Sequence, residues 1–231
     1  MSPTPAKPPN DLVFLIDVDN TLLDNDAVIS ELRRYLVGAL GRESQIEYWR
    51  LFEQLRRELG YADYLGALQR YRLEHPREPE VLGVSLFLLS HPFADRLYPR
   101  ALDVVAHLRR RSPVVILSDG DAVFQPYKVE RSGLWAAVAG DVLIYIHKER
   151  VLDDVERRYP AQRYVMVDDK LRILTEIKKV WGERVTTVFV GQGHYATDQA
   201  TLDSYPAADV TVERIADLLD LPESSYQPAG V

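Results

Sequence analysis

The chain of 231 residues contains no cysteine, and this absence excludes several kinds of site. Without thiols the protein cannot form a disulfide framework, a cysteine-ligated zinc site, an iron–sulfur cluster or a thiol nucleophile. Positive charge is also scarce, because 28 lysine and arginine residues stand against 35 aspartate and glutamate residues, giving a net charge of −7. This balance argues against a nucleic-acid partner, which normally needs a basic surface. An anionic substrate would have to be held by local positive charge.

Long hydrophobic runs are missing as well. No stretch approaches the length of about 18 apolar residues that is typical of a membrane helix, and the longest compact run, residues 81–89, is interrupted by Gly83 and Ser85. Residues 1–10 contain four prolines and no hydrophobic segment, so we expect a disordered lead-in and no secretory signal. Together with the lack of cysteine, these features predict a cytoplasmic protein with no membrane partner. The sequence leaves the oligomeric state open.

The chain does contain five short apolar runs that are typical of buried parallel strands. Helix-like stretches near residues 149–159 and 170–181 separate the last three runs. This alternation predicts an α/β fold in which helices cover both faces of a parallel sheet. The five predicted strands are residues 12–16, 114–117, 142–146, 164–167 and 185–190.

The first two runs are separated by residues 22–112, which is far more chain than one crossover helix requires. Apolar residues recur at helical spacing in three parts of this gap, and Pro79 could open a fourth helix. We interpret residues 22–97 as a small all-helical cap, and residues 11–21 and 98–231 as the core. The alternative is a set of ordinary crossover helices packed on the sheet.

Polar side chains follow four of the five strands, at the edge where open parallel sheets bind ligands. Four carboxylates against one lysine would crowd like charge there, and such a site needs a divalent cation or protonation. Oxygen-only ligands favour Mg²⁺. Capping of a neighbouring helix is an alternative role for either pair of acids. The residues at these strand ends are Asp17, Asp19, Ser118, Lys148, Asp168 and Asp169.

The order of these residues resembles the haloacid dehalogenase superfamily, in its phosphatase branch, over about residues 12–200. The matching parts are the D-x-D-x-T motif at residues 17–21, then Ser118, Lys148 and the acids at 168–169. The resemblance implies a Rossmann-like core, an α-helical cap inserted after the first motif and an Mg²⁺-dependent phosphoaspartyl mechanism.

The resemblance also implies a role for each residue. Asp17 would be the nucleophile that attacks phosphorus, and Asp19 would protonate the leaving alkoxide and later deprotonate water. Thr21, Ser118 and the adjacent Asp119 would bind the phosphate. Lys148 would bring positive charge beside Asp17, with Lys128, expected on the protein surface, as the alternative lysine. The metal site would consist of the side chains of Asp17 and Asp169, the backbone carbonyl of Asp19, and Asp168, which would orient the ligands.

These roles predict a phosphatase of a small phosphate monoester. A phosphomutase would use the same residues, a dehalogenase would need neither Asp19 nor a metal, and a non-catalytic phosphometabolite-binding module is a further alternative. Asp24 is expected to cap the first cap helix, and His194 to lie in a flexible loop. Arginines 33, 34, 56 and 57 are expected to form a solvated face.

Overall fold

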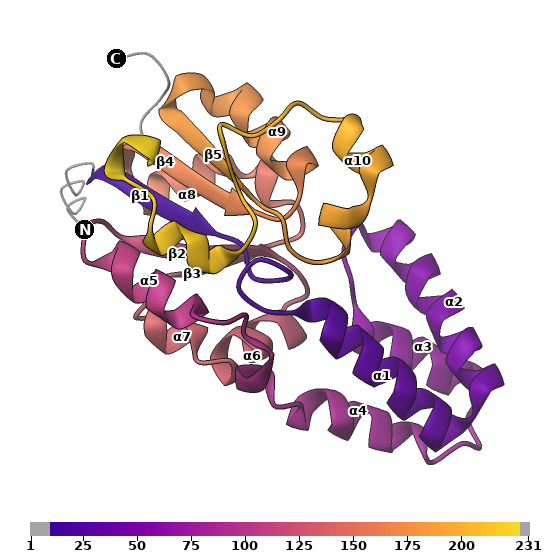
Figure 1. Ribbon diagram of the computed structural model, residues 1–231. Helices are drawn as coiled ribbons and strands as arrows, with labels where there is room; N and C mark the ends of the chain where they lie inside the picture. The colour runs from indigo at the N-terminus through magenta and orange to yellow at the C-terminus, as the bar shows by residue number, and fades with distance from the viewer. Residues whose placement is uncertain (1–9, 227–231) are drawn as a thin grey trace, which may run out of the picture.

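The computed structural model describes residues 10–226 and contains a six-stranded sheet in which all paired strands are parallel (Figure 1). The strand order is β3-β2-β1-β4-β5-β6, and the α/β fold predicted from the sequence is confirmed. The sixth strand was missed, since its three residues include only one buried side chain, Val212. The strands are β1 (Asn10–Ile16), β2 (Val114–Asp119), β3 (Val142–Tyr145), β4 (Ala161–Asp168), β5 (Val185–Val190) and β6 (Val210–Val212).

The central strand β1 is apolar on both faces because both faces are covered by helices. Phe14 and Ile16 belong to the hydrophobic cluster on one face, and Val13 and Leu15 to the cluster on the other. Helices α5, α6 and α7 contribute to the first cluster, and α8 and α9 to the second. These helices are α5 (Ala101–Arg109), α6 (Phe124–Arg131), α7 (Leu134–Ala137), α8 (Leu152–Arg158) and α9 (Leu171–Trp181), and the shorter α10 (Gln199–Asp203) follows β5.

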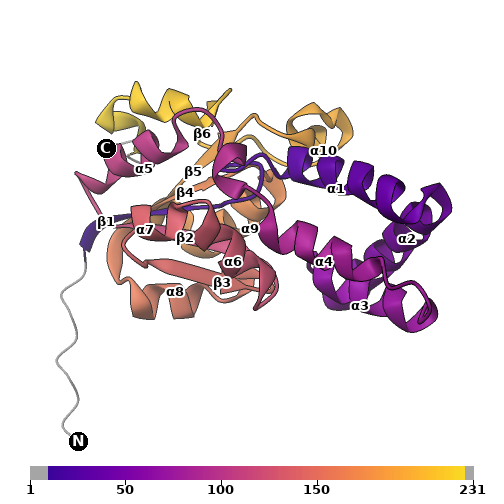
Figure 2. The same ribbon diagram turned by 90° about the horizontal axis from the view of Figure 1, so that it is seen from below.

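Four further helices lie between β1 and β2 in the chain, and we call residues 25–90 the helical insert. Figures 1 and 2 show these helices grouped together beside the sheet instead of stacked on its faces, next to the end of β1. This arrangement fits a cap better than crossover helices, while the boundaries at residues 22 and 97 stay a prediction. The helices of the insert are α1 (Asn25–Leu40), α2 (Arg42–Leu59), α3 (Tyr64–Glu74) and α4 (Val81–Ser90).

Local sequence signals set the ends of these helices. The Asp24 carboxylate accepts a hydrogen bond from the backbone N–H of Ala27 at 2.8 Å, so Asp24 caps α1 as expected. Gly60 ends α2 with a φ of 83°, a left-handed conformation that glycine adopts without steric cost. The chain leaves the insert through the short 3-10 helix η1 (Phe93–Arg96) and re-enters the core at α5.

The N-terminal lead-in predicted for residues 1–10 lies outside the described residues except for Asn10. That residue already belongs to β1, where it pairs with Ala161 of β4, so the predicted boundary was wrong by one residue. Within residues 10–226, no helix has both the length and the apolar character needed to cross a membrane.

Candidate active site

The D-x-D-x-T motif forms a tight turn directly after β1. The backbone N–H of Asp17 still donates to the carbonyl of Val167 in β4, at 3.0 Å. The next residues turn back on themselves, because the N–H groups of Thr21, Leu22 and Leu23 all donate to the Val18 carbonyl, at 3.2, 2.9 and 2.9 Å. The chain therefore leaves the sheet abruptly, and the two acids of the motif lie at its edge.

Three carboxylates meet at this edge. Asp17, Asp168 and Asp169 each offer an oxygen within 4.8 Å of the others, and each residue is at most 3% exposed. Both oxygens of Asp169 and Oδ2 of Asp17 are buried and have no hydrogen-bond donor among the described residues. Buried carboxylate oxygens without donors are costly, and hard oxygen ligands of this kind suit Mg²⁺. These residues fit a divalent cation held between β1 and β4.

Lys148 contacts two of these three acids closely. Its Nζ lies 2.6 Å from Oδ1 of Asp17 and 2.6 Å from Oδ2 of Asp168, and it donates to the Leu117 carbonyl at 3.2 Å. Burial disfavours the charged amine, but the ion pairs with Asp168 and Asp17 outweigh it and raise the pKa of Lys148. The lysine is therefore a fixed positive charge beside Asp17.

The two acids after β4 have different surroundings. Oδ1 of Asp168 accepts the backbone N–H of Lys170 at 2.8 Å, and its Oδ2 pairs with Lys148. Asp169 has only a loose ion pair, 3.9 Å from the partly exposed ammonium of Lys170. Burial raises the pKa of both carboxyl groups, although Lys148 and Lys170 partly oppose it. A bound cation would therefore stabilise Asp169 more than Asp168. Neither carboxylate oxygen of Asp169 caps α9.

The side chain of Asp19 points away from the acidic cluster and towards Lys128 on α6. The Lys128 ammonium donates to both oxygens of Asp19, at 2.7 and 2.9 Å, and to Oδ1 of Asn25 at 3.2 Å. The prediction that Lys128 lies on the surface was wrong, because its side chain is fully buried. Lys128 follows Phe124 by four residues on the apolar face of α6, and that spacing could have revealed its position. The predicted metal contact of Asp19, through its backbone carbonyl, stays a prediction.

Of the three residues predicted to bind phosphate, Asp119 contacts the segment that carries Lys148. Oγ of Ser118 accepts from the amide of Gln125 at 3.0 Å, and Oγ1 of Thr21 is buried without a partner among the described residues. Oδ1 of Asp119 accepts the backbone N–H of Lys148 at 2.7 Å, and burial raises the pKa of this carboxyl to about 6. Asp119 therefore anchors the lysine-bearing segment. Phosphate binding by these residues stays a prediction.

A cavity of about 490 Å³ lies between the insert and the core. Asp19, Asp119 and Asp169 line it on the core side, and Arg33 and Arg56 line it on the insert side. All four arginines of the predicted solvated face are exposed, as expected, and two of them, Arg33 and Arg56, also line the cavity. Aromatic side chains of the insert also line the cavity, namely Trp49, Phe52, Tyr61 and Tyr64.

The loop after β5 closes one side of the cavity. His194 begins the short 3-10 helix η4 (His194–Thr197) in this segment and lines the cavity, which differs from the flexible loop expected from the sequence. It is held by the insert, because its backbone N–H and its Nδ1 lie 2.7 and 2.8 Å from the Asp26 carboxylate of α1. Arg56 of α2 donates to the hydroxyl of Tyr195 at 3.3 Å. The insert and the core are therefore joined by polar contacts at the cavity mouth.

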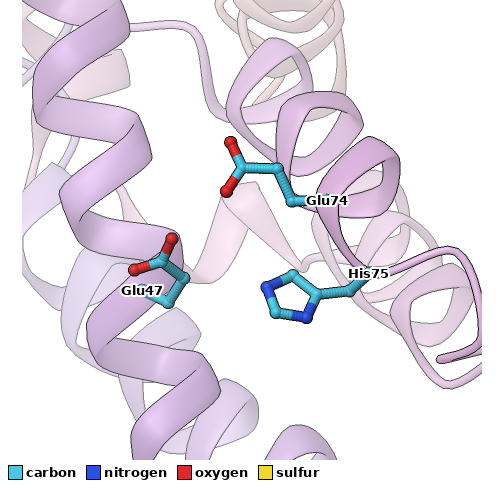
Figure 3. Close-up of side chains that lie close together, drawn as sticks. All are labelled: Glu47, Glu74 and His75. Carbon is cyan, nitrogen blue, oxygen red and sulfur yellow. The ribbon is translucent and has the colours of Figure 1, made fainter.

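A second group of possible metal ligands, shown in Figure 3, lies on the insert alone and outside the cavity lining. Glu47 on α2 faces Glu74 and His75 at the end of α3. The Arg50 guanidinium lies 2.6 Å from Glu47 and 3.6 Å from Glu74. An arginine already compensates these exposed acids, so the cluster is a surface ion-pair network.

Comparison with known proteins agrees with this geometry. The family described as "haloacid dehalogenase-like hydrolase" matches residues 12–193. The chain is 61% identical to a haloacid dehalogenase-like hydrolase of Burkholderia xenovorans LB400, whose crystal structure superposes with a TM-score of 0.89 over 93% of this chain and 100% of the other. No match was found among curated proteins.

Two more distant structures share the fold. One is the L-2-haloacid dehalogenase of Xanthobacter autotrophicus with chloropropionic acid covalently bound (18% identity, 90% and 97% of the two chains, TM-score 0.60). The other is the HAD-hydrolase YfnB of Bacillus subtilis bound to magnesium (16% identity, 92% and 100% of the two chains, TM-score 0.59). At such identities the likeness concerns the fold alone, and the reaction must be inferred from the residues of this chain.

Proposed function

This chain belongs to the haloacid dehalogenase-like hydrolase family, and we propose that it is an Mg²⁺-dependent phosphatase of a small phosphate monoester. The observation that carries the proposal is the buried carboxylate group of Asp17, Asp168 and Asp169. Lys148 pairs with Asp17 and Asp168, whereas Asp169 has only the ion pair with Lys170 at 3.9 Å and no hydrogen-bond donor to its oxygens among the described residues. A divalent cation would supply the missing positive charge and would bind phosphate oxygens beside Asp17.

The chain's own residues suit the two half-reactions. The Asp17 carboxylate attacks phosphorus and forms an acyl phosphate, while Asp19 gives a proton to the leaving alkoxide oxygen. In the second step, Asp19 takes a proton from the water that attacks the phosphoaspartate, and Asp17 is released as a carboxylate. Lys128 contacts both oxygens of Asp19, so Asp19 has to exchange one of these contacts for a proton before it can act as the acid. Lys148 holds Asp17 in place and remains positively charged beside the phosphate.

The helical insert has a part in this proposal as a cap. It forms the outer wall of the cavity, and its contacts with the loop at His194 and Tyr195 would exclude water during phosphoryl transfer. A phosphomutase would use the same cap and the same acids, and a non-catalytic phosphometabolite-binding module would use the cavity alone. A cytoplasmic location is part of the proposal.

A 2-haloacid dehalogenase is the second candidate, favoured by the fold shared with the enzyme that carries chloropropionic acid covalently. Asp17 could attack carbon as well as phosphorus. Halide, however, leaves without a proton, so this reaction would give no role to Asp19. It would also leave the oxygens of Asp169 buried without compensation. We therefore place phosphatase activity first.

One experiment separates these reactions. Purified protein is given an aryl phosphate or 2-chloropropionate, with Mg²⁺ or with EDTA, and released phosphate and chloride are measured. The phosphatase proposal expects phosphate release with Mg²⁺, none with EDTA, and none from Asp17→Asn. Asp103→Asn, a change on α5 at a side chain that is 63% exposed and lies outside the acidic cluster, is the control that should keep the wild-type rate. Chloride release in EDTA without phosphate release would establish the dehalogenase instead.

A further inference from the structure

The insert side of the cavity carries one arginine with no acidic partner. The Arg33 guanidinium lies over the indole ring of Trp49, 4.2 Å from the ring centroid. Within residues 10–226, Arg33 makes no ion pair and donates no side-chain hydrogen bond. A guanidinium that lies over an aromatic ring contacts the ring with the flat face of the guanidinium. The N–H donors point outward in the plane of the guanidinium and remain free to bind other groups. Arg33 is exposed to solvent and therefore offers N–H donors that no other described residue accepts, at the wall of the cavity.

The other cationic side chains around the cavity already have partners. Arg56 lies 3.8 Å from Glu53 and donates to Tyr195, and Arg172 lies 3.1 Å from the buried Glu149. Lys170 pairs with Asp169 at 3.9 Å. The acids on the insert side, Glu53 and Asp26, are likewise engaged, by Arg56 and by His194. Among the described arginine and lysine side chains that line the cavity, Arg33 is thus the one without an acidic partner.

An apolar surface separates Arg33 from the catalytic edge. Phe52 and Tyr64 stack with ring centroids 4.8 Å apart and an interplanar angle of 25°, and Trp49 meets Phe52 edge-on at 5.0 Å. All three rings line the cavity and are nearly buried. A flat or short apolar group of a ligand would find dispersion contacts there, with Arg33 next to Trp49 at one end of the surface.

We propose that the substrate is a phosphate ester of a small hydroxy acid, whose carboxylate binds Arg33. This inference rests on the proposed phosphatase function. The phosphate lies at Asp17, the apolar body of the leaving group lies along the aromatic wall, and the carboxylate accepts the free donors of Arg33. Arginine presents paired donors that match the two oxygens of a carboxylate. A cavity of about 490 Å³ suits a molecule of this size.

The test uses pairs of aryl phosphates that differ only in charge. The 3- and 4-carboxyphenyl phosphates are compared with the 3- and 4-carbamoylphenyl phosphates, whose amide has the shape of the carboxylate and no charge. The measured quantity is the ratio of kcat/KM for the acid to kcat/KM for its amide, in each protein with Mg²⁺. Comparing this ratio between proteins cancels the different leaving abilities of the two phenols.

Arg33→Gln is expected to lower this ratio about tenfold for at least one pair, which is equivalent to about 1.4 kcal/mol of transition-state stabilisation. Arg33→Lys, which keeps the charge and loses the paired donors, should give an intermediate ratio. Arg34→Gln is the matched control, because Arg34 is the next residue on the same helix and its side chain is 72% exposed. It should keep the wild-type ratio. Circular dichroism checks that each variant is folded.

The possible failures are distinguishable. If the wild-type protein hydrolyses both esters and Arg33→Gln and Arg33→Lys leave the ratio unchanged, the hydroxy-acid inference is overturned and the phosphatase function stands. If Arg34→Gln lowers the ratio as much as Arg33→Gln, the effect comes from overall surface charge and the inference is again overturned. If the wild-type protein hydrolyses no phosphate ester with Mg²⁺, the proposed phosphatase function is refuted. The hydroxy-acid inference, which rests on that function, is then refuted as well.

Discussion

The contact between Asp19 and Lys128 predicts a strong energetic coupling between these two residues. Removing one partner of a buried ion pair typically costs about 3–5 kcal/mol, because the other charge remains buried alone. The two partners here differ in exposure, since the Lys128 side chain is fully buried and that of Asp19 is 24% exposed. Water can therefore reach Asp19 after its partner is removed, but it cannot reach Lys128.

This asymmetry gives the size of each effect. Lys128→Met should lower the free energy of unfolding by about 2 kcal/mol, below the usual range because Asp19 can be hydrated. Asp19→Ala should cost more, about 3 kcal/mol, because it leaves the buried ammonium with only Oδ1 of Asn25. In the double variant no isolated charge remains, so its cost should also be about 3 kcal/mol, which corresponds to a coupling of about 2 kcal/mol.

The assay is urea unfolding of the wild-type protein, the two single variants and the double variant, followed by circular dichroism in a buffer with EDTA. Chelation matters because a cation bound near Asp17 would stabilise the folded state and obscure the comparison. If the effects of the two single changes add in the double variant within about 0.5 kcal/mol, the residues are independent and the argument is refuted. If Lys128→Met lowers the free energy of unfolding more than Asp19→Ala does, the argument from side-chain exposure is refuted. The coupling between the two residues would not be affected by that result.

Three further predictions concern other parts of the molecule. In EDTA, Asp169→Asn should raise the midpoint of thermal unfolding, because it removes a buried carboxylate without hydrogen-bond donors. Mg²⁺ should raise the midpoint of the wild-type protein further, but not that of the variant. A midpoint lower than that of the wild type in EDTA would contradict this prediction. Gly193→Ala should lower the free energy of unfolding by about 2 kcal/mol in urea, because φ of Gly193 is +69° and the new Cβ would lie 2.7 Å from the Asn20 side chain. The control is Gly133→Ala, which should cost less, because φ there is +85° but no atom lies within 4 Å of the new Cβ. Burial lowers the pKa of His91 more than Glu31 raises it, so the unfolded chain binds a proton before the folded protein does. Stability should therefore fall as the pH drops below about 6.5, and His91→Gln should flatten this part of the curve relative to the wild type.

The order and type of the core elements could be predicted because parallel strands buried on both faces leave continuous apolar runs. The run that became β1 supplies Val13 and Leu15 to one face and Phe14 and Ile16 to the other, so no polar residue interrupts it. Strand β6 leaves no such trace, since it is short and sits at the sheet edge, where one neighbour is enough. The helical insert could be recognised by its length and spacing, but its boundaries could not, because they depend on packing between segments.

The candidate site could be predicted where its residues follow strands. Parallel pairing aligns Ile16 with Ile116 and with Val167, so the residues after β1, β2 and β4 necessarily come together. This alignment alone brings Asp17 next to Asp168 and within one residue of Asp169. Residues that reach the site from helices escape such reasoning, because their position depends on the angle at which each helix packs.

Lys128 and Arg33 are two residues on helices whose positions could not be predicted from the sequence. A lysine on a helix is usually solvated, and only the packing of α6 against the turn at Asp19 turns this one into a buried counter-ion. Arg33 and Arg34 are adjacent on α1, yet one lies over Trp49 at the cavity and the other points into solvent. We expect the residues that select the substrate to be of this kind, with positions that depend on helix rotation. The strand ends, in contrast, set only the chemistry that the family has in common.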